Sequence, residues 1–360
     1  MKNFFITLLI FTSFSLFAQN DNNVILISLD GLRWQELFGG AADSMILNKN
    51  LTHNSNVIDK YQAEDKETAR KLLMPWFWSE IATKGQIYGN RWEGNNMNCT
   101  NRQWFSYPGY NEILTGYSDP EINSNAKKYN PNKTVLEWVN EQDGFQGKVA
   151  AFCSWDVFPY IINDKRSGIY VNAGFQKAEH DELSEKEIFL NKLQTEIPSP
   201  WGTVRLDAFT HHYMMEYVKK NHPRLVYISY GETDDFAHDG RYDHYLNSAH
   251  QTDQWIKEIW EYVQSDPHYK DNTTLVITTD HGRGHSPMTE WKSHGTIYKG
   301  SDQIWAAAIG PNVKAIGEVK SEGQLYQNQI AKTVATFLGL DYKGDRYEEG
   351  KAIESMVTNK

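Results

Sequence analysis

The chain has 360 residues, a formal charge of -10 and a pI near 5.7. No stretch of this acidic sequence is basic enough to follow a phosphate backbone, which argues against a nucleic-acid polymer as partner. Only Cys99 and Cys153 are present, and the sequence leaves open whether they form one disulfide bond or stay as buried thiols.

The chain begins with the pattern of a secretory signal peptide. Lys2 precedes an apolar run over residues 4–17, and Ala18 is a small residue before the expected cut. The run is shorter than the ~20 residues of a membrane-spanning helix. We therefore predict a periplasmic or secreted protein without a transmembrane anchor, with a signal peptide over residues 1–18 and a single domain over residues 19–360.

Five apolar runs rich in β-branched residues predict buried parallel strands. They cover residues 24–29, 148–153, 225–230, 274–279 and 305–309. Helix-like stretches cover residues 133–142, 206–219, 243–263 and 324–338. This alternation predicts a three-layer α/β/α domain with a mostly parallel central sheet, whose strand carboxyl ends meet at one edge.

Residues 39–94 depart from this pattern, because they are polar and carry a Met-Pro-Trp-Phe-Trp cluster. We predict an irregular insertion that forms a small cap near the site, with one short helix around residues 60–73. Residues 165–200 suggest a second, smaller insertion. Core packing accounts for most tryptophans, but four of them alternatively form the walls of a substrate cleft: Trp76, Trp78, Trp92 and Trp104.

Three aspartates and two histidines follow closely on predicted strands: Asp30, Asp234, His238, Asp280 and His281. A third histidine, His294, lies in a loop before the last predicted strand. Taken singly, Asp30 fits a helix N-cap, and Asp234 with His238 fits a pair on one helix face. Asp280-His281 is more specific, because the two residues directly follow a buried strand. Together the six residues predict two nitrogen and oxygen ligand sets of the kind that suits zinc.

In this order, the Asp-Gly after the first strand, a Ser/Thr loop, Asp-x3-His, Asp-His-Gly and His-Gly resemble the alkaline phosphatase superfamily. The closest resemblance is to its nucleotide pyrophosphatase/phosphodiesterase-like branch, over residues 24 to about 310. It implies an alkaline-phosphatase-like fold and two Zn²⁺ ions, with Mn²⁺ or Mg²⁺ less favoured. One ion would be bound by Asp234, His238 and His294. The other would be bound by Asp30, Asp280, His281 and the oxygen of Ser106.

The segment from Phe105 to Gly116 resembles the superfamily's nucleophile loop, and it puts Ser106 at the position of the nucleophile. The alternative role for Ser106 is an ordinary helix N-cap. Asn125 matches an asparagine that binds a non-bridging phosphoryl oxygen in diesterase-like relatives, although Asn123 and Asn130 are close enough to be alternatives.

The resemblance also indicates the class of ester. Where some relatives place Lys-x-Arg, this chain has Trp155-Asp156-Val157, which favours a phosphodiester over a doubly charged monoester. We predict Trp155 and Arg283 as substrate contacts, while Lys165 and Arg166 are further bases that could reach the site. A sulfatase would need a Cys/Ser-x-Pro-x-Arg motif, which the segment from Cys99 to Arg102 lacks.

These observations predict an exported two-metal hydrolase of small-molecule phosphate esters, with a phosphoseryl intermediate on Ser106 and a preference for phosphodiesters. Two alternative activities are a phosphomonoesterase and a phosphotransferase that resembles phosphoglycerate mutase. An alternative of another class is a non-catalytic binding protein that retains the fold.

Overall fold

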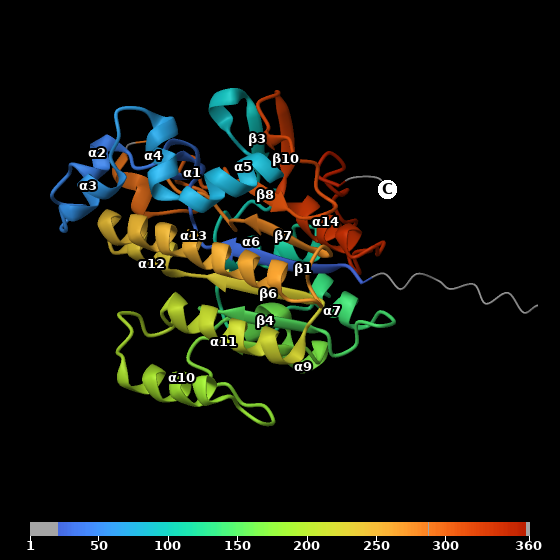
Figure 1. Cartoon of the computed structure of the whole chain (residues 1–360). Helices are drawn as coiled ribbons and strands as arrows, with labels where there is room; N and C mark the ends of the chain where they lie inside the picture. Colours follow the sequence, from blue (N-terminus) through green and yellow to red (C-terminus); the bar gives the residue numbers. More distant parts are fainter. Residues whose placement is uncertain (1–20, 287, 358–360) are drawn as a thin grey trace, which may run out of the picture.

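The computed structural model describes residues 21–286 and 288–357, so the predicted signal peptide lies outside the described residues. An eight-stranded sheet in the order β5-β4-β6-β1-β7-β8-β2-β9 runs through the middle of the molecule (Figure 1). The strands are β1 Asn23–Leu29, β2 Gly85–Tyr88, β4 Val149–Cys153, β5 Tyr170–Ala173, β6 Leu225–Tyr230, β7 Thr273–Thr278, β8 Ala306–Ile309 and β9 Gly317–Glu318. A separate parallel pair contains β3 (Asn95–Asn98) and β10 (Gly323–Tyr326).

Five neighbouring strands, β5, β4, β6, β1 and β7, run parallel to one another. β1 lies between β6 and β7, and Val24 pairs with Leu225 on one side and Thr274 on the other. Every residue of β1, β4, β6 and β7 is buried. Burial on both faces explains why these runs are apolar without alternation. The prediction of a mostly parallel central sheet is confirmed.

β8 does not fit the prediction of five parallel strands, because it pairs antiparallel with both β7 and β2. The segment between β7 and β8 has one short 3₁₀ turn, η3 (Met288–Lys292), among its described residues. A parallel return needs a crossover that carries the chain back to the opposite edge of the sheet. This segment makes no such crossover, so β8 starts at the edge where β7 ends.

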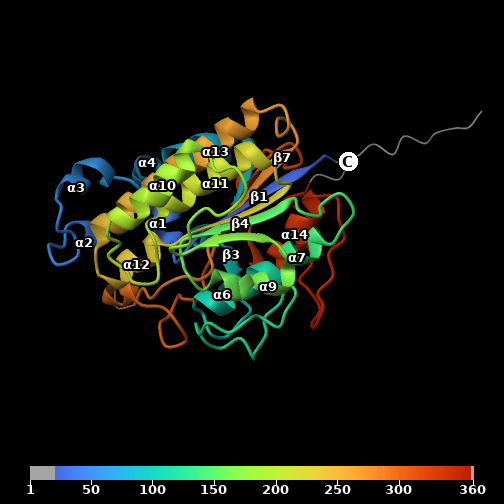
Figure 2. The same ribbon diagram turned by 90° about the horizontal axis from the view of Figure 1, so that it is seen from below.

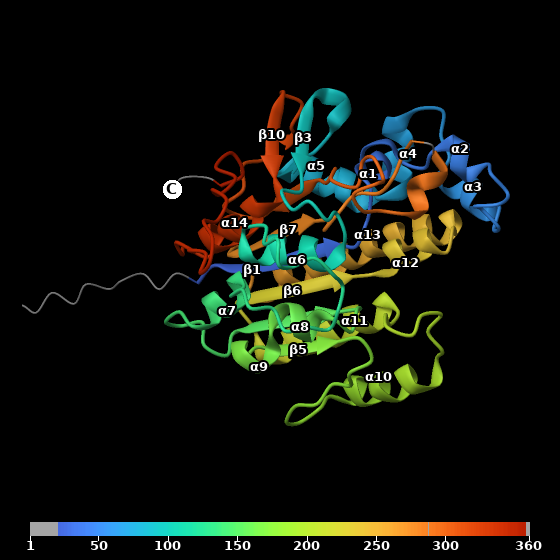
Figure 3. The same cartoon turned by 180° about the vertical axis from the view of Figure 1, so that it is seen from behind.

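Helices cover both faces of the sheet (Figures 2 and 3). α11 (Asp207–Asn221) and α13 (Tyr242–Ser265) cover one face, and α6 (Ser106–Thr115), α7 (Val135–Asn140), α8 (Phe158–Ile162) and α14 (Ile330–Phe337) cover the other. Alternate residues of β1 enter the two cores: Ile25 and Ile27 pack in the core with α13, and Val24 and Leu26 pack in the core with α6. The three-layer α/β/α architecture is therefore confirmed.

The four predicted helices correspond to α7, α11, α13 and α14. The last is shorter than predicted, because residues 323–326 form β10 and Gln327–Gln329 forms a 3₁₀ turn, η4. Smaller elements at the edges of the fold are η2 (Arg91–Glu93), α9 (Asp164–Ser167) and α10 (Glu185–Glu196). No described helix is long and apolar enough to cross a membrane. Cys99 and Cys153 are both buried with free thiols, so they do not form a disulfide bond.

The polar stretch over residues 39–94 is largely helical rather than irregular, and its β2 belongs to the main sheet. It contains α2 (Asp43–Ile46), α3 (Asn56–Tyr61), α4 (Lys66–Leu73), a π-helical turn, η1 (Phe77–Ile81), and α5 (Ala82–Lys84), and it follows α1 (Trp34–Gly39). The single helix expected around residues 60–73 is two helices, because Asp65 accepts a hydrogen bond from the Thr68 N–H and starts α4 as an N-cap. Trp76 and Trp78 are buried in the core, and Trp76 also lines a surface pocket together with Trp260 of α13.

Candidate active site and metal centre

The six predicted ligands lie around the carboxyl ends of three adjacent strands. Asp30 follows β1, and Asp280 and His281 come shortly after β7. Asp234 and His238 lie on α12 (Glu232–His238), a short helix that begins just after β6. Because β6, β1 and β7 are neighbours and run parallel, their ends bring these side chains together at one edge of the sheet.

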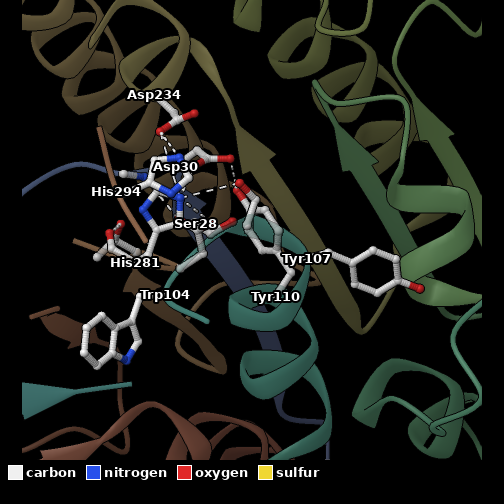
Figure 4. A network of polar contacts seen from close by, with 12 residues as sticks. Ser28, Asp30, Trp104, Tyr107, Tyr110, Asp234, His281 and His294 are labelled. Carbon is white, nitrogen blue, oxygen red and sulfur yellow. Dashed lines mark hydrogen bonds and ion pairs between the residues drawn. The ribbon is translucent and has the colours of Figure 1, made fainter. Parts of the chain in front are cut away.

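Asp30 and Asp280 lie around the His281 imidazole and form one group with it. Asp30 and His281 are labelled in Figure 4. His281 Nε2 lies 3.3 Å from Asp30 Oδ1 and 3.4 Å from Asp280 Oδ2. The hydroxyl oxygen of Ser106 lies 3.5 Å from the same nitrogen. The four residues that the resemblance assigns to one ion are therefore brought together around one point.

Asp234, His238 and His294 form the second group. His238 Nε2 lies 3.1 Å from Asp234 Oδ2 and 3.0 Å from His294 Nε2. The ligand atoms of these three residues all lie within 4.8 Å of one another, as do those of Asp30, Asp234 and His281. Asp234 Oδ1 is 3.9 Å from His281 Nε2, so the two groups adjoin and Asp234 lies between them.

The donor atoms in both groups fit a bound cation. Asp30 Oδ1, Asp280 Oδ2 and His294 Nδ1 are buried and have no hydrogen-bond partner among the described residues. Buried polar atoms without partners are rare in native structures, because desolvation is costly. Three imidazole nitrogens and several carboxylate oxygens that face one another are a ligand set for divalent metals.

The electrostatics of the site follow from three buried carboxylates close together. Burial and the neighbouring Asp234 raise the pKa of Asp30, and burial with Asp30 raises the pKa of Asp280 well above its usual value. Burial alone would lower the pKa of His281, but Asp280, Asp30 and Asp234 raise it to about 9. The site therefore has a negative potential that favours a cation.

Ser106 is the first residue of α6 and is buried beside the ligands. Gly109 allows α6 to approach them, because a Cβ at this position would come within 2.4 Å of the Asp280 carbonyl oxygen. Tyr110, one turn after Ser106, donates a 2.7 Å hydrogen bond to Asp30 Oδ2. The sequence prediction missed Tyr110, although its i+4 spacing from Ser106 puts both residues on the same helix face.

Arg283, which we predicted as a substrate contact, pairs with a predicted metal ligand. Its side chain is fully buried, and Nη1 donates to Asp234 Oδ1. Nε and Nη2 donate to the carbonyl oxygens of Trp291 and Lys292, at 2.6 and 2.7 Å. Burial alone would raise the pKa of Asp234, but Arg283, His238 and His294 hold it well below its usual value. The guanidinium thus stabilises a ligand carboxylate.

Two comparisons with known proteins show what the chain resembles. A family model described as the metalloenzyme superfamily matches residues 182–342, which contain five of the six predicted ligands. The fold matches that of the alkaline phosphatase PafA with a TM-score of 0.58 at 12% identity, over 93% of this chain and 98% of PafA. Part of the sequence is thus similar to the metalloenzyme superfamily, and the fold is similar to that of an alkaline phosphatase.

Other solved structures share this fold. The lipoteichoic acid synthase LtaP from Listeria monocytogenes matches with a TM-score of 0.56 at 13% identity, over 91% of this chain and 74% of LtaP. A phosphonate monoester hydrolase from Silicibacter pomeroyi matches with a TM-score of 0.58 at 13% identity, over 94% of this chain and 76% of the hydrolase. No curated protein sequence matches the chain. At these identities the likeness concerns the fold, and the superfamily implies a divalent metal.

Among the three asparagines considered for the phosphoryl oxygen, Asn125 is the one that contacts the segment next to Ser106. Asn125 Oδ1 accepts a 3.0 Å hydrogen bond from the backbone N–H of Tyr107, next to Ser106. Asn123 is exposed and donates to the Pro120 carbonyl oxygen, and Asn130 is buried in contact with Asn111. Since its oxygen is used by Tyr107, Asn125 presents its NH₂ group as a donor.

Trp155 lies in the loop after β4 and is partly buried. Its ring packs edge-on against Phe158, 6.3 Å between centroids, and Phe158 packs against Tyr110. Trp155 is thus connected to the Asp30 side of the site through two aromatic contacts. Trp104, also labelled in Figure 4, has a ring that points away from the ligands.

Proposed function

We propose that the chain is an exported two-zinc phosphoric ester hydrolase that uses Ser106 as nucleophile and prefers phosphodiesters. The observation that supports this proposal most strongly is the position of Ser106 Oγ, 3.5 Å from His281 Nε2 and beside the unpartnered oxygens of Asp30 and Asp280. A serine hydroxyl at the N-terminus of a helix, next to a metal ligand set, has the requirements of an activated nucleophile.

In the proposed reaction, the zinc ions would supply positive charge and the protein would supply the nucleophile. Zinc bound at the two ligand sets would supply positive charge that favours the Ser106 alkoxide and offsets charge on the departing oxygen. Ser106 Oγ attacks phosphorus as the bond to the leaving alcohol breaks, and the alcohol takes up a proton. The phosphoseryl ester then reacts with water, which restores the Ser106 hydroxyl and releases the phosphate product.

Asn125 is the group we propose to hold a non-bridging oxygen during this reaction. Its Oδ1 is fixed by the Tyr107 N–H, so the NH₂ group is oriented before the substrate arrives. A fixed donor stabilises charge in the transition state without reorganisation. Tyr110 orients Asp30 through a 2.7 Å hydrogen bond, and such support of a ligand typically tunes the metal site.

The preference for a phosphodiester rests on the positions of the nearby bases. Arg166 binds Glu137 at 2.8 Å and three backbone carbonyl groups, and Arg283 binds Asp234. Lys165 lies over the Tyr129 ring, 4.7 Å from its centroid. None of these three bases is therefore available to hold the second charge of a phosphomonoester.

Phosphomonoesterase activity is the main alternative, because the solved structures with this fold include an alkaline phosphatase as well as a phosphonate monoester hydrolase. A phosphotransferase that resembles phosphoglycerate mutase fits an exported protein poorly, since its substrates are cytosolic. A non-catalytic role fits poorly as well, because six ligands and the nucleophile are all present.

The test compares three esters with the same leaving group: 4-nitrophenyl phosphate, methyl 4-nitrophenyl phosphate and 4-nitrophenyl sulfate. We expect the highest kcat/KM with the diester. We expect S106A to lose on the order of 10³-fold or more of this activity and to retain its zinc, whereas S265A, at an exposed serine on α13, keeps full activity. Full activity in S106A would contradict the nucleophile, and a large monoester preference would contradict the substrate class.

A further inference from the structure

A cavity of about 370 Å³ lies between α1, the start of α4 and the loop that follows His281. Its lining includes Gln35 from α1, Asp43, Glu64, Lys66 and Trp92 from the 39–94 stretch, and His285 from the loop. This volume is in the range of small-molecule sites. No role in the proposed reaction has been assigned to any of these residues.

The cavity wall is joined by hydrogen bonds to the segment that carries the metal ligands. Arg33, three residues after Asp30, donates from Nη1 to the Gly284 carbonyl oxygen at 3.3 Å. The Gly284 N–H in turn donates to the Ser293 carbonyl oxygen at 2.9 Å, directly before His294. The described residues of the loop between Gly282 and His294 therefore contribute His285 and Met288 to the cavity wall, and the same loop carries the predicted ligand His294. A ligand in the cavity would lie on the side of the site covered by the 39–94 stretch.

Trp92 provides an aromatic surface at the edge of the cavity, with 47% of its area exposed. Trp34 packs edge-on against it, 4.7 Å between centroids. Lys66 Nζ lies 3.4 Å from the ring centroid. Gly39 also contacts the ring, because a Cβ there would come within 2.7 Å of Trp92 Cη2. An exposed but fixed aromatic ring is typical of a surface that binds a ligand with an apolar face.

Polar groups surround this surface, and they carry both signs of charge. Gln35 Oε1 is buried and has no hydrogen-bond partner among the described residues, so it can accept from a ligand hydroxyl. Arg33 is paired with Glu36 and adds little net positive charge. Of the other charged side chains that line the cavity, Asp43 and Glu64 are acidic and Lys66 is basic. This excess of negative charge disfavours binding of a phosphate group in the cavity. The chemistry matches an uncharged ring with several hydroxyl groups.

We propose that this cavity binds the alcohol part of the substrate, and that this alcohol is a sugar. The role as leaving-group site rests on the proposed hydrolase function, whereas sugar binding does not. The sugar would pack one face on Trp92 and donate a hydroxyl to Gln35. The 39–94 stretch would then select the substrate, while the sheet edge performs the reaction.

Saturation-transfer NMR with methyl α-D-glucopyranoside, and separately with uridine, tests binding without turnover. We expect the glucoside to show transfer from the full zinc-loaded protein, and W92A and Q35A to reduce it at least 10-fold. W260A is the matched control, because Trp260 is also partly exposed but lies on α13 outside this cavity. Absence of transfer to the glucoside in folded wild-type protein overturns the proposal. A stronger signal from uridine that W92A removes overturns the sugar class.

Kinetics test the leaving-group role. The substrates are two methyl phosphodiesters, one with glucose esterified at its 6-hydroxyl and one with uridine at its 5′-hydroxyl. We expect the glucose ester to have the higher kcat/KM, and W92A to lower it at least 10-fold through KM while W92F restores part of it. If the protein binds the glucoside and hydrolyses methyl 4-nitrophenyl phosphate but not the glucose ester, the leaving-group role alone fails. If it hydrolyses none of these esters, the hydrolase function fails as well, and sugar binding stands.

Discussion

Arg283 donates a hydrogen bond to Asp234, and this contact connects three ligand segments of the metal centre. Arg283 follows His281 by two residues, and Asp234 lies on α12. The other donors of Arg283 bind the carbonyl oxygens of Trp291 and Lys292, just before His294. A single buried guanidinium thus fixes the loop after β7, the helix after β6 and the segment that carries His294. It also offsets part of the charge of a carboxylate that lies in both ligand groups.

We expect R283Q to weaken zinc binding by roughly 10- to 100-fold, the usual effect of losing a group that orients a ligand. The loss should fall mainly on the ion bound by Asp234, His238 and His294. Zinc content after dialysis against a graded chelator measures this, together with the zinc-dependent rise in Tm. R205Q is the control, because Arg205 is equally buried but binds Thr210 and Asn172, neither of which is a predicted ligand. If R283Q keeps two tightly bound zinc ions, Arg283 has only a role in folding.

Gly31 is required where the chain turns from β1 into the site. Its φ is +59°, and a Cβ would come within 2.7 Å of Arg283 Nη1 and 2.9 Å of Asp234 Oδ1. We expect G31A to displace the Arg283–Asp234 pair and lower zinc affinity, in addition to about 1 kcal/mol of left-handed backbone strain. G168A is the control, since Gly168 has φ +63° but meets nothing within 4 Å. Equal zinc affinity in the two variants would show that the close contact at Gly31 has no effect on the ligands.

Removal of the metal should reveal the repulsion among the buried carboxylates. Burial and Asp30 raise the pKa of Asp280, so at neutral pH this residue destabilises the metal-free fold. We expect D280N to unfold at a higher urea concentration than the wild type in excess chelator. In excess zinc the order should reverse, because the wild type gains more binding free energy. The same order of stability under both conditions would mean that Asp280 is not a ligand.

Much of this fold can be predicted from local sequence, but side-chain partners cannot. The apolar runs of β1, β4, β6 and β7 identify the parallel core, and the same runs bring Asp30, Asp234 and Asp280 to one edge. The direction of β8 depends on the path of the preceding loop, and the sequence of residues 305–309 does not indicate that path. β2 was missed because four residues that include Gly85 and Gln86 carry no strand pattern.

At the site, the partners of Arg283 likewise could not be predicted from the sequence. A basic residue two positions after a ligand is compatible with a substrate contact or with a buried pair. Its partners, Asp234 and the carbonyl groups of Trp291 and Lys292, are set by tertiary packing. The position of Tyr110 beside the site could have been predicted, because its i+4 spacing from Ser106 puts both residues on one helix face.

Asp253 of α13 supplies a pH-dependent contribution to stability that is independent of the metal centre. Its carboxylate accepts the N–H groups of Trp76 and Phe77, each at 2.8 Å. Burial outweighs these two hydrogen bonds and raises its pKa from 3.8 to about 7. Between these values the folded protein holds a proton that the unfolded chain has lost. The contribution of Asp253 is therefore full below pH 4 and decreases as the pH rises to about 7.

We expect the stability difference between wild type and D253N to shrink as the pH rises through this window, by roughly 1 kcal/mol per pH unit. Urea unfolding in excess chelator, at several pH values from 4 to 8, measures the difference. The stability difference between wild type and D243N should instead grow as the pH rises. Burial alone would raise the pKa of Asp243, but Arg241 and the backbone N–H groups lower it, so its stabilising contribution is lost as the pH falls. Parallel pH profiles for wild type and D253N would show that Asp253 is ionised in the fold, and that its two hydrogen bonds outweigh burial.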